Sequence, residues 1–261
     1  SIVSAEPAST SNNCGNRFIE MLVDMLESTE GKHQSWQVVH SLNILKALVR
    51  DARLADRMAP WMERIIKVAV CWFDKSVYRR RLPEASSAQL VYSIRNSTSM
   101  LFSVLVTRLF GVKRNKADTS RKNRMSSLLF FRHYPALFSF LLEHIETLSR
   151  HRQERQQRDF SVAYPTLIIL SRLTPSISEN NIFDIARFHE PLRQLIFYCN
   201  DIHVRTMAIR AFVQLLQMNN YCEQFKYLSD QLRQQLDSLS CDDFCRNISR
   251  NRLHGIALLL S

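Results

Sequence analysis

Glycine is so scarce in this chain that few folds remain open to it. The 261 residues include only four glycines, whereas proteins in general average about 7%. Hairpin turns and phosphate-cradling loops depend on glycine, because it adopts positive φ and lets other groups approach the backbone closely. The chain also lacks a G-x-G-x-x-G motif and a Walker loop. A Rossmann-type cofactor site is therefore disfavoured, and helices joined by short polar turns remain.

Apolar residues recur at helical spacing along most of the chain. Trp36, for example, opens an apolar stripe that continues to Val49. Pro60 stands at a first-turn position, Gly111 at a C-cap position, and Asn or Asp precedes several helices as N-caps do. No segment reads as a strand for more than a few residues. The predicted helices cover residues 16–26, 36–49, 61–73, 91–110, 128–149, 164–173, 182–198, 204–218, 222–239 and 244–260.

Two of these helices share one pattern that is typical of the second helix of a HEAT or armadillo repeat. An Arg in the position of Arg95 usually packs structurally in such helices. We therefore expect an all-α fold, a HEAT/armadillo-like right-handed α-solenoid, with an irregular compact helical domain as the alternative. Residues 1–15 are expected to be a flexible segment and 16–261 a single helical-repeat domain. The matching residues are Ile94-Arg95-Asn96 with Leu101, Phe102 and Leu105, and Val204-Arg205-Thr206 with Ala211, Phe212 and Leu215.

Positive charge is concentrated in one third of the chain. Between Arg79 and Arg158, sixteen Lys and Arg stand against five Asp and Glu, which accounts for the whole formal net charge of +11. A concentrated basic band on a helical scaffold favours a polyanionic partner. Solvated helix faces and loops are the alternative interpretation. Basic loops are expected at about 74–88, 111–127 and 150–160.

The most specific basic feature is the loop that follows Gly111. Six Lys and Arg and one acid, Asp118, fall within about a dozen residues, and such like charges repel unless an anion joins them. Further arginines lie across the next connection, including Arg155 and Arg158. Contacts from such residues to phosphate fix position more than sequence. The predicted RNA-binding residues are Lys113, Arg114, Lys116, Arg121, Lys122, Arg124, Arg150 and Arg152.

No residue pattern for catalysis is found in the sequence. It has neither H-E-x-x-H nor G-x-S-x-G, and Cys241 and Cys245 near His254 lack the further ligands of a zinc site. Histidines beside apolar stripes, such as His40 and His254, are expected to be hydrogen-bonded structural residues. We expect a chain that is not an enzyme and that holds no cofactor or metal of its own.

The scattered cysteines favour a reduced, cytoplasmic setting, since no secretory signal is visible. No apolar run approaches the ~18 residues of a transmembrane helix. The chain begins with Ser1 rather than Met, so we expect it to be a piece of a longer protein.

Several stretches of the chain carry a family resemblance. They are SIRNSTSMLFSVLVTRLFGVKRNK at 93–116, VHSLNILKALVRD at 39–51, Asn123-Arg124-Met125, and Phe130-Phe131. These stretches resemble the THADA (thyroid adenoma-associated protein) family. Near the end, residues 246–255 are similar to the family's closing Arg-Gln-Asn-His-x-His-Gly motif. The family's Arg-Arg-Ser-Ala-Gly motif lies upstream of the stretch that Ser4–Pro7 resembles, and residues 75–89 look inserted relative to the family.

The resemblance implies a large α-solenoid protein that is the non-catalytic partner of a FtsJ-type methyltransferase. Together the two place a 2′-O-methyl group on the ribose at position 32 of the tRNA anticodon loop, with S-adenosylmethionine bound by the partner. The implied partners are tRNA and the FtsJ-type 2′-O-methyltransferase catalytic subunit. The alternative is a helical-repeat scaffold whose basic band meets an acidic protein or a membrane-associated partner.

Overall fold

The computed structural model describes residues 14–28, 35–79, 87–111, 123–150, 160–175 and 183–216, with isolated residues between 222 and 259. These residues are almost entirely helical, and the predicted all-α class is confirmed. The chain divides into two compact units, residues 1–123 and 124–261. Within the described residues, no helix has both the length and the apolar character needed to cross a membrane.

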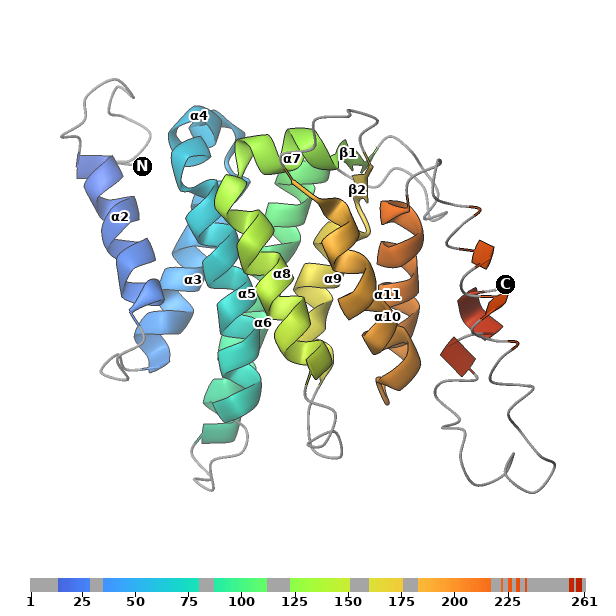
Figure 1. Ribbon diagram of the computed structural model, residues 1–261. Helices are drawn as coiled ribbons and strands as arrows, with labels where there is room; N and C mark the ends of the chain where they lie inside the picture. The colour runs from blue at the N-terminus through green and yellow to red at the C-terminus, as the bar shows by residue number, and fades with distance from the viewer. Residues whose placement is uncertain are drawn as a thin grey trace. The chain divides into compact units, whose positions relative to one another are not determined.

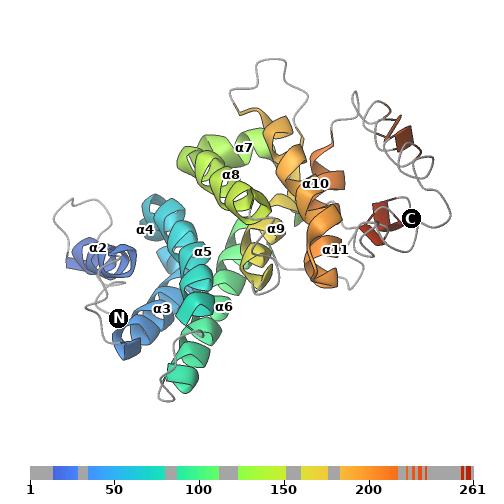
Figure 2. The ribbon, with the colours of Figure 1, turned by 60° about the horizontal axis from the view of Figure 1, so that its bottom comes forward.

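The first unit is built from helical hairpins (Figures 1 and 2). Within it, α6 packs against both α3 and α5, and α2 packs against α3 and α5. The predicted glycine at the end of α6 is confirmed as a C-cap, because Gly111 adopts φ +82°. In chain order the elements are α2 (Cys14–Glu27), α3 (Ser35–Arg50), the short 3-10 helix η1 (Ala52–Leu54), α4 (Ala55–Met58), the 3-10 helix η2 (Ala59–Trp61), α5 (Met62–Arg79) and α6 (Ser87–Phe110).

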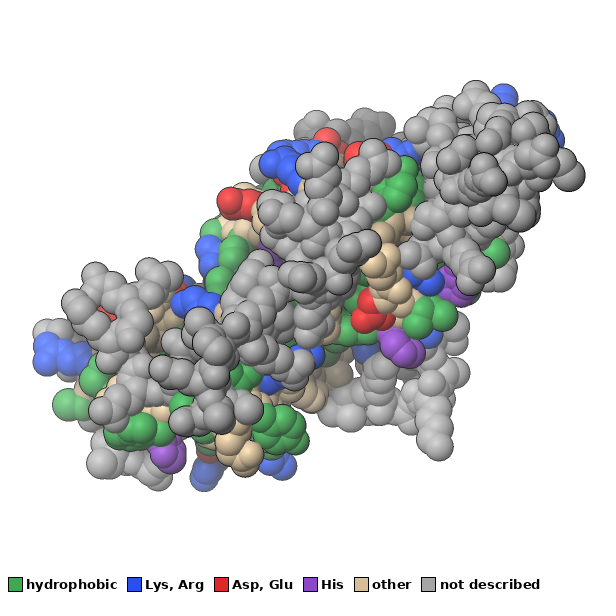
Figure 3. Space-filling view, turned by 90° about the horizontal axis from the view of Figure 1, so that it is seen from below, with side chains coloured by type: hydrophobic (Ala, Val, Ile, Leu, Met, Phe, Trp, Pro, Cys, Tyr) green, Lys and Arg blue, Asp and Glu red, His purple; other side chains and the backbone are tan. Residues whose placement is uncertain are grey.

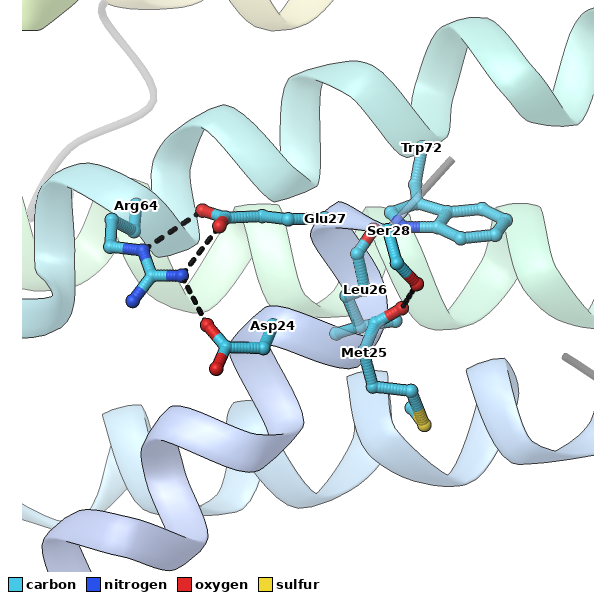
Figure 4. A network of polar contacts seen from close by, with 7 residues as sticks. All are labelled: Asp24, Met25, Leu26, Glu27, Ser28, Arg64 and Trp72. Carbon is cyan, nitrogen blue, oxygen red and sulfur yellow. Dashed lines mark hydrogen bonds and ion pairs between the residues drawn. The ribbon is translucent and has the colours of Figure 1, made fainter. Parts of the chain in front are cut away.

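Polar contacts join α2 to α5 at the surface of this unit (Figure 4). The Arg64 guanidinium donates to the carboxylates of Glu27, at 2.5 and 3.0 Å, and Asp24, at 2.6 Å. These contacts, led by the one with Glu27, raise the pKa of Arg64. About two turns further along α5, the buried Trp72 indole N–H donates to Leu26 O at 3.0 Å. The Arg64 and Trp72 contacts fix α2 on α5 at two points.

The second unit contains shorter helices around an aromatic core. Phe131 and Phe188 are fully buried with parallel rings, and Phe138 meets both of them edge-on. Helix α10 packs on α8 and α11, and α11 packs on α9. The elements are β1 (Met125–Ser126), α7 (Ser127–His133), α8 (Pro135–Arg150), η4 (Phe160–Ala163), α9 (Tyr164–Leu170), β2 (Leu173–Thr174), η5 (Ile185–Phe188), α10 (His189–Tyr198) and α11 (Ile202–Leu215).

The predicted single helix over 128–149 is wrong, because the helix is interrupted at Tyr134, which separates α7 from α8. Tyr134 has φ −132° and ψ 69°, outside the helical region. The residue before a proline is sterically kept out of the α region, and Pro135 itself has no N–H to continue the hydrogen-bond ladder. Pro135 therefore starts a new helix at its first position.

The predicted N-cap role of Asp is confirmed at the start of α11. Asp201 Oδ1 accepts hydrogen bonds from the backbone N–H groups of His203, at 2.8 Å, and Val204, at 3.2 Å. Asp184 caps η5 in the same way through Ala186 N–H at 3.1 Å. The Asp201 cap sets where the helix that carries Arg205 begins, and the Asp184 cap starts the 3-10 helix that leads directly into α10.

Candidate nucleic-acid interface

The predicted basic loop leaves α6 and returns close to its starting point. Gly111 ends the helix, with its N–H donating to Thr107 O at 2.9 Å. A Cβ built on Gly111 would lie 3.8 Å from the Asn123 side-chain oxygen, so the two ends of the loop are close together. The candidate residues Lys113, Arg114, Lys116, Arg121 and Lys122 fall between these ends, outside the described residues.

The chain that follows the loop is held in place by a short parallel β-pair. Met125 and Ser126 of β1 pair with Leu173 and Thr174 of β2. The Met125 N–H also donates to Arg172 O at 3.0 Å. Arg124, the one candidate of the loop that lies in the described part of the chain, is half-buried immediately before β1. Two-residue strands have no periodicity that a sequence could reveal, so this anchor was not predicted.

The second candidate cluster begins at the end of α8. Arg150 is largely exposed, and its guanidinium donates to Glu146 one turn earlier, at 2.5 Å. A cation in the last turn of a helix is favoured by the helix dipole, and an exposed i,i+4 pair contributes only a few tenths of a kcal/mol. Arg150 could therefore turn to an external anion at little cost. Arg152 lies outside the described residues.

The predicted structural role of His254 is confirmed by its contact with a buried arginine. Arg205 of α11 is 5% exposed and donates from Nη1 to Cys199 O at 2.6 Å. Its Nη2 lies 3.2 Å from His254 Nδ1. Only glycine fits at the adjacent position 255, because a Cβ there would come within 2.3 Å of Ile196 O. The His-Gly pair near the end of the chain thus packs on α10 and α11.

Trp36 and His40 differ from what the sequence predicts. Trp36 was expected to open the buried stripe of α3 and His40 to be structural, yet both are exposed and their rings meet edge-on at 5.8 Å between centroids. The reason is angular: Leu42, Leu45 and Val49 occupy the core-facing side of α3, whereas positions 36, 40 and 44 lie together on the opposite side.

Among the described residues, no group of three or more His, Cys, Asp or Glu side chains could bind a metal ion. Cys241 and Cys245 lie outside the described part of the chain. Cys199 is buried and Cys71 half-buried, and burial raises the pKa of the Cys71 thiol above its ordinary value. Cys14 and Cys222 are exposed.

Two family models match the chain. The model described as THADA/TRM732, DUF2428 matches residues 1–79, and the one described as Trm732, C-terminal TPR repeats matches residues 95–261. The predicted helical-repeat class is thereby confirmed, although the matching model describes TPR repeats where HEAT or armadillo repeats were expected. No solved structure matches the chain.

Curated relatives align with almost the whole chain. The tRNA (32-2′-O)-methyltransferase regulator THADA of Chlorocebus aethiops is 29% identical over 263 residues, covering 98% of this chain and 12% of its own length. The protein of the same name from Homo sapiens is 30% identical, covering 91% of this chain and 11% of its own length. The tRNA (32-2′-O)-methyltransferase regulator trm732 of Schizosaccharomyces pombe is 25% identical, covering 85% of this chain and 13% of its own length.

The chain thus spans about one eighth of the length of the curated relatives it matches, since the covered shares are 11–13%. The Trm732 repeat model alone accounts for more than half of the chain, and the THADA/TRM732 model covers most of the remainder. The chain belongs to the THADA/TRM732 family.

Proposed function

We propose that this chain is the RNA-contacting part of a non-catalytic regulator of a tRNA 2′-O-methyltransferase that acts at position 32 of the anticodon loop. The observation that carries the proposal is the near full-length alignment of the chain with relatives named as regulators of that reaction. The catalytic partner would be a FtsJ-type methyltransferase that binds S-adenosylmethionine. The compartment would be the cytoplasm, where tRNA is modified.

The loop after α6 supports contact with RNA. Its two ends are fixed, by the Gly111 C-cap on one side and by the β1–β2 pair on the other. Its six cations fall within about a dozen residues of sequence, and closely spaced cations concentrate positive potential where phosphates would bind. Lys113, Arg114, Arg121 and Lys122 would contact phosphates, with Lys116 and Arg124 beside them. Arg150 and Arg152 are further candidates for contact with RNA.

A charge-removal variant tests the loop. Changing Lys113, Arg114, Arg121 and Lys122 to Ala should weaken binding broadly across tRNAs and flatten the slope of log K against log[salt] by about three, since each phosphate contact contributes roughly 0.7–0.9. The melting temperature should barely move, because exposed loop charges are worth under about half a kcal/mol each. The readout is a tRNA-binding titration at several salt concentrations.

A matched control removes the same charge elsewhere. Arg17, Arg53, Arg132 and Arg187 are exposed on helices outside the loop. Their change to Ala should lower the long-range attraction slightly but leave the salt slope close to that of the parent chain. An equal loss of slope in both variants would indicate non-specific attraction and would remove the loop from the interface.

The regulatory role is tested in cells. Loss of the full-length gene should abolish 2′-O-methylation at position 32 of the client tRNAs while other ribose methylations persist, as read from a ribose-methylation map. Restoring the gene with the loop variant should restore methylation only in part. Unchanged methylation at position 32 in the deletion strain would refute the proposed function.

A further inference from the structure

Acidic side chains are absent from two neighbouring helices of the first unit. Helix α3 and helix α6 together contain 40 residues, without a single Asp or Glu. The 24 acids of the 261-residue chain, if spread evenly, would place about four there. The basic residues on these helices are Lys46, Arg50, Arg95 and Arg108.

The other two long helices of the same unit differ. Helix α2 carries Glu20, Asp24 and Glu27, and α5 carries Glu63 and Asp74. Their acids lie among basic residues, as in the Arg64 contacts with Asp24 and Glu27. Charge is therefore segregated within one packed unit: α2 and α5 are mixed, whereas α3 and α6 are purely positive.

Aromatic and apolar side chains stand exposed on the same two helices. Trp36 on α3 is 54% exposed and Tyr92 on α6 is 64% exposed. Ile44 on α3 and Met100 on α6 are exposed as well. Burying any one of these side chains in the core would have been favourable by about 1.5–3 kcal/mol, so their exposure leaves binding energy available to a ligand.

The exposed residues of α3 and α6 lie on two helices that are direct neighbours, and we call these residues together the α3–α6 face. The helices pack directly on one another, and the Asn43 amide of α3 donates to Ser97 Oγ of α6 at 3.2 Å. Figure 3 shows hydrophobic side chains, a His and Lys or Arg side chains gathered at its lower left, where the first helices of the chain lie. The face consists of Trp36, His40, Asn43, Ile44, Ala47 and Arg50 of α3 and Gln89, Tyr92, Asn96, Met100, Ser103 and Thr107 of α6.

We propose that the α3–α6 face binds unpaired nucleotides of an RNA, with Trp36 and Tyr92 as stacking platforms. This rests on the proposed function, and it adds a second contact surface to the basic loop. Aromatic rings stack on bases of any sequence, and nearby cations attract the phosphates between them. Arg50 is exposed at the end of α3, and the half-buried Lys46 supports the Asn43 amide through a 3.2 Å hydrogen bond. A surface without carboxylates repels no phosphate.

Neither duplex RNA nor a protein fits this face as well. Bases in a duplex are already stacked, so exposed rings would gain nothing from them. A protein docking site is usually centred on a contiguous apolar patch, whereas here Asn96, Ser103 and Thr107 run along the exposed side of α6 between the larger side chains. The first unit carries its acids elsewhere, which is the segregation that a polyanionic ligand favours.

The test measures binding of a 12-nucleotide unstructured RNA and of a duplex of the same length to the full chain. Trp36→Ala and Tyr92→Ala should each weaken binding of the single strand by on the order of 10- to 100-fold, because stacking is worth roughly 1–3 kcal/mol per base. Binding of the duplex should change less than twofold. Trp36→Phe should restore most of the loss, since a smaller ring still stacks.

Tryptophan fluorescence gives a direct readout at the face. Trp36 is exposed, whereas Trp72 is buried with its indole N–H bonded to Leu26 O. The single strand should quench the emission of the parent chain, and this quenching should be lost in Trp36→Phe. Met21→Ala, which removes a 58% exposed side chain from α2, is the control and should change neither affinity nor quenching.

The outcomes separate this proposal from the proposed function. If the loop variant loses tRNA affinity while Trp36→Ala and Tyr92→Ala bind single strands as the parent does, the α3–α6 face is not an RNA site and the proposed function stands. If the two substitutions weaken binding of a methyltransferase subunit but not of RNA, the face is a protein interface and this inference is wrong. A chain that binds no RNA at all overturns both.

Discussion

Helices α6 and α11 share one sequence pattern but place its arginine in different surroundings. Every apolar position of the pattern is buried in both helices, from Ile94 and Val204 at the start to Leu105 and Leu215 at the end. The arginine that follows the first apolar residue is half-buried in α6, as Arg95, and buried in α11, as Arg205. The pattern therefore specifies the core side of the helix, whereas the segments packed beside it decide what its polar positions do.

The two helices can also be compared through the ring that each contacts on a neighbouring helix. The Phe102 ring of α6 packs edge-on with the Phe73 ring of α5, with 5.9 Å between the ring centroids and 84° between the ring planes. The Phe212 ring of α11 packs in a similar way with the His189 ring of α10, with 5.4 Å between centroids and 65° between planes. The geometry is repeated, but an apolar ring in the first unit is replaced by a titratable ring in the second.

The largest expected effect tests whether the two cores are equivalent. Phe102→Ala and Phe212→Ala should each cost about 3–5 kcal/mol of stability, because each removes a buried ring from a packed core. The cost should appear in the unit that carries the substitution, measured by hydrogen exchange of peptides from α3 and α5 or from α8 and α10 in a urea series.

Exposed neighbours on the same helices provide controls. Met100→Ala and Val213→Ala remove side chains that are 44% and 41% exposed, and each should cost less than about 1 kcal/mol. If Phe102→Ala were as mild as these, the core of α6 would not be the counterpart of the core of α11.

An intermediate effect is expected where the two helices differ. Arg205→Met should cost about 1–3 kcal/mol, since the buried Cys199 carbonyl loses a charged donor. Arg95→Met, at a half-buried site, should cost less than about 1 kcal/mol.

A double-mutant cycle of Arg205→Met with His254→Ala should also show a coupling of at least about 0.5 kcal/mol, because the two side chains are in contact. Thermal unfolding of the four variants gives these values, and additive effects would show that His254 does not brace Arg205.

Much of this fold is predictable from the sequence because the core positions repeat with helical period. The apolar stripes locate α2, α3, α5, α6 and α11, and their ends differ from the predicted ones by a few residues. The break at Tyr134 was missed because the apolar residues continue across it in helical phase, so the pattern outweighed Pro135. In physical terms the proline restricts the residue before it and removes one backbone donor, a local effect that a periodicity over many residues averages away.

The candidate site is less predictable, since it depends on which helices are neighbours. Each helix without acids is unremarkable alone, and the α3–α6 face exists only because α3 and α6 pack together. Trp36 was assigned to the core because aromatic residues at helical spacing usually are. The basic loop was found from sequence because its cations cluster within about a dozen residues, and its role remains a prediction.

The smallest expected effect concerns His189, which takes the place in the second unit's ring pair that Phe73 takes in the first. Burial lowers the pKa of His189 below its ordinary value of 6.5, and Arg193 lowers it further, while the contact of Nε2 with Leu215 O at 3.4 Å and the charge of Asp184 oppose this. As the pH falls through 6.5, the unfolded chain takes up a proton at this residue before the folded chain does. Stability of the second unit should therefore decrease as the pH falls below 6.5.

The substitution His189→Phe isolates this contribution, because it recreates the Phe73–Phe102 pair of the first unit and removes the titrating group. Between pH 7.5 and pH 5.5 the second unit of the variant should lose less stability than that of the parent chain, as measured by hydrogen exchange of peptides from α8 and α11 in urea. His133, His144, His203 and His254 are retained in both chains, so their contributions cancel in the difference. Equal losses of stability in the parent chain and the variant would mean that His189 has the same proton affinity in the folded and the unfolded chain. The exchange of a phenylalanine for a histidine in the ring pair would then have no effect on how stability depends on pH.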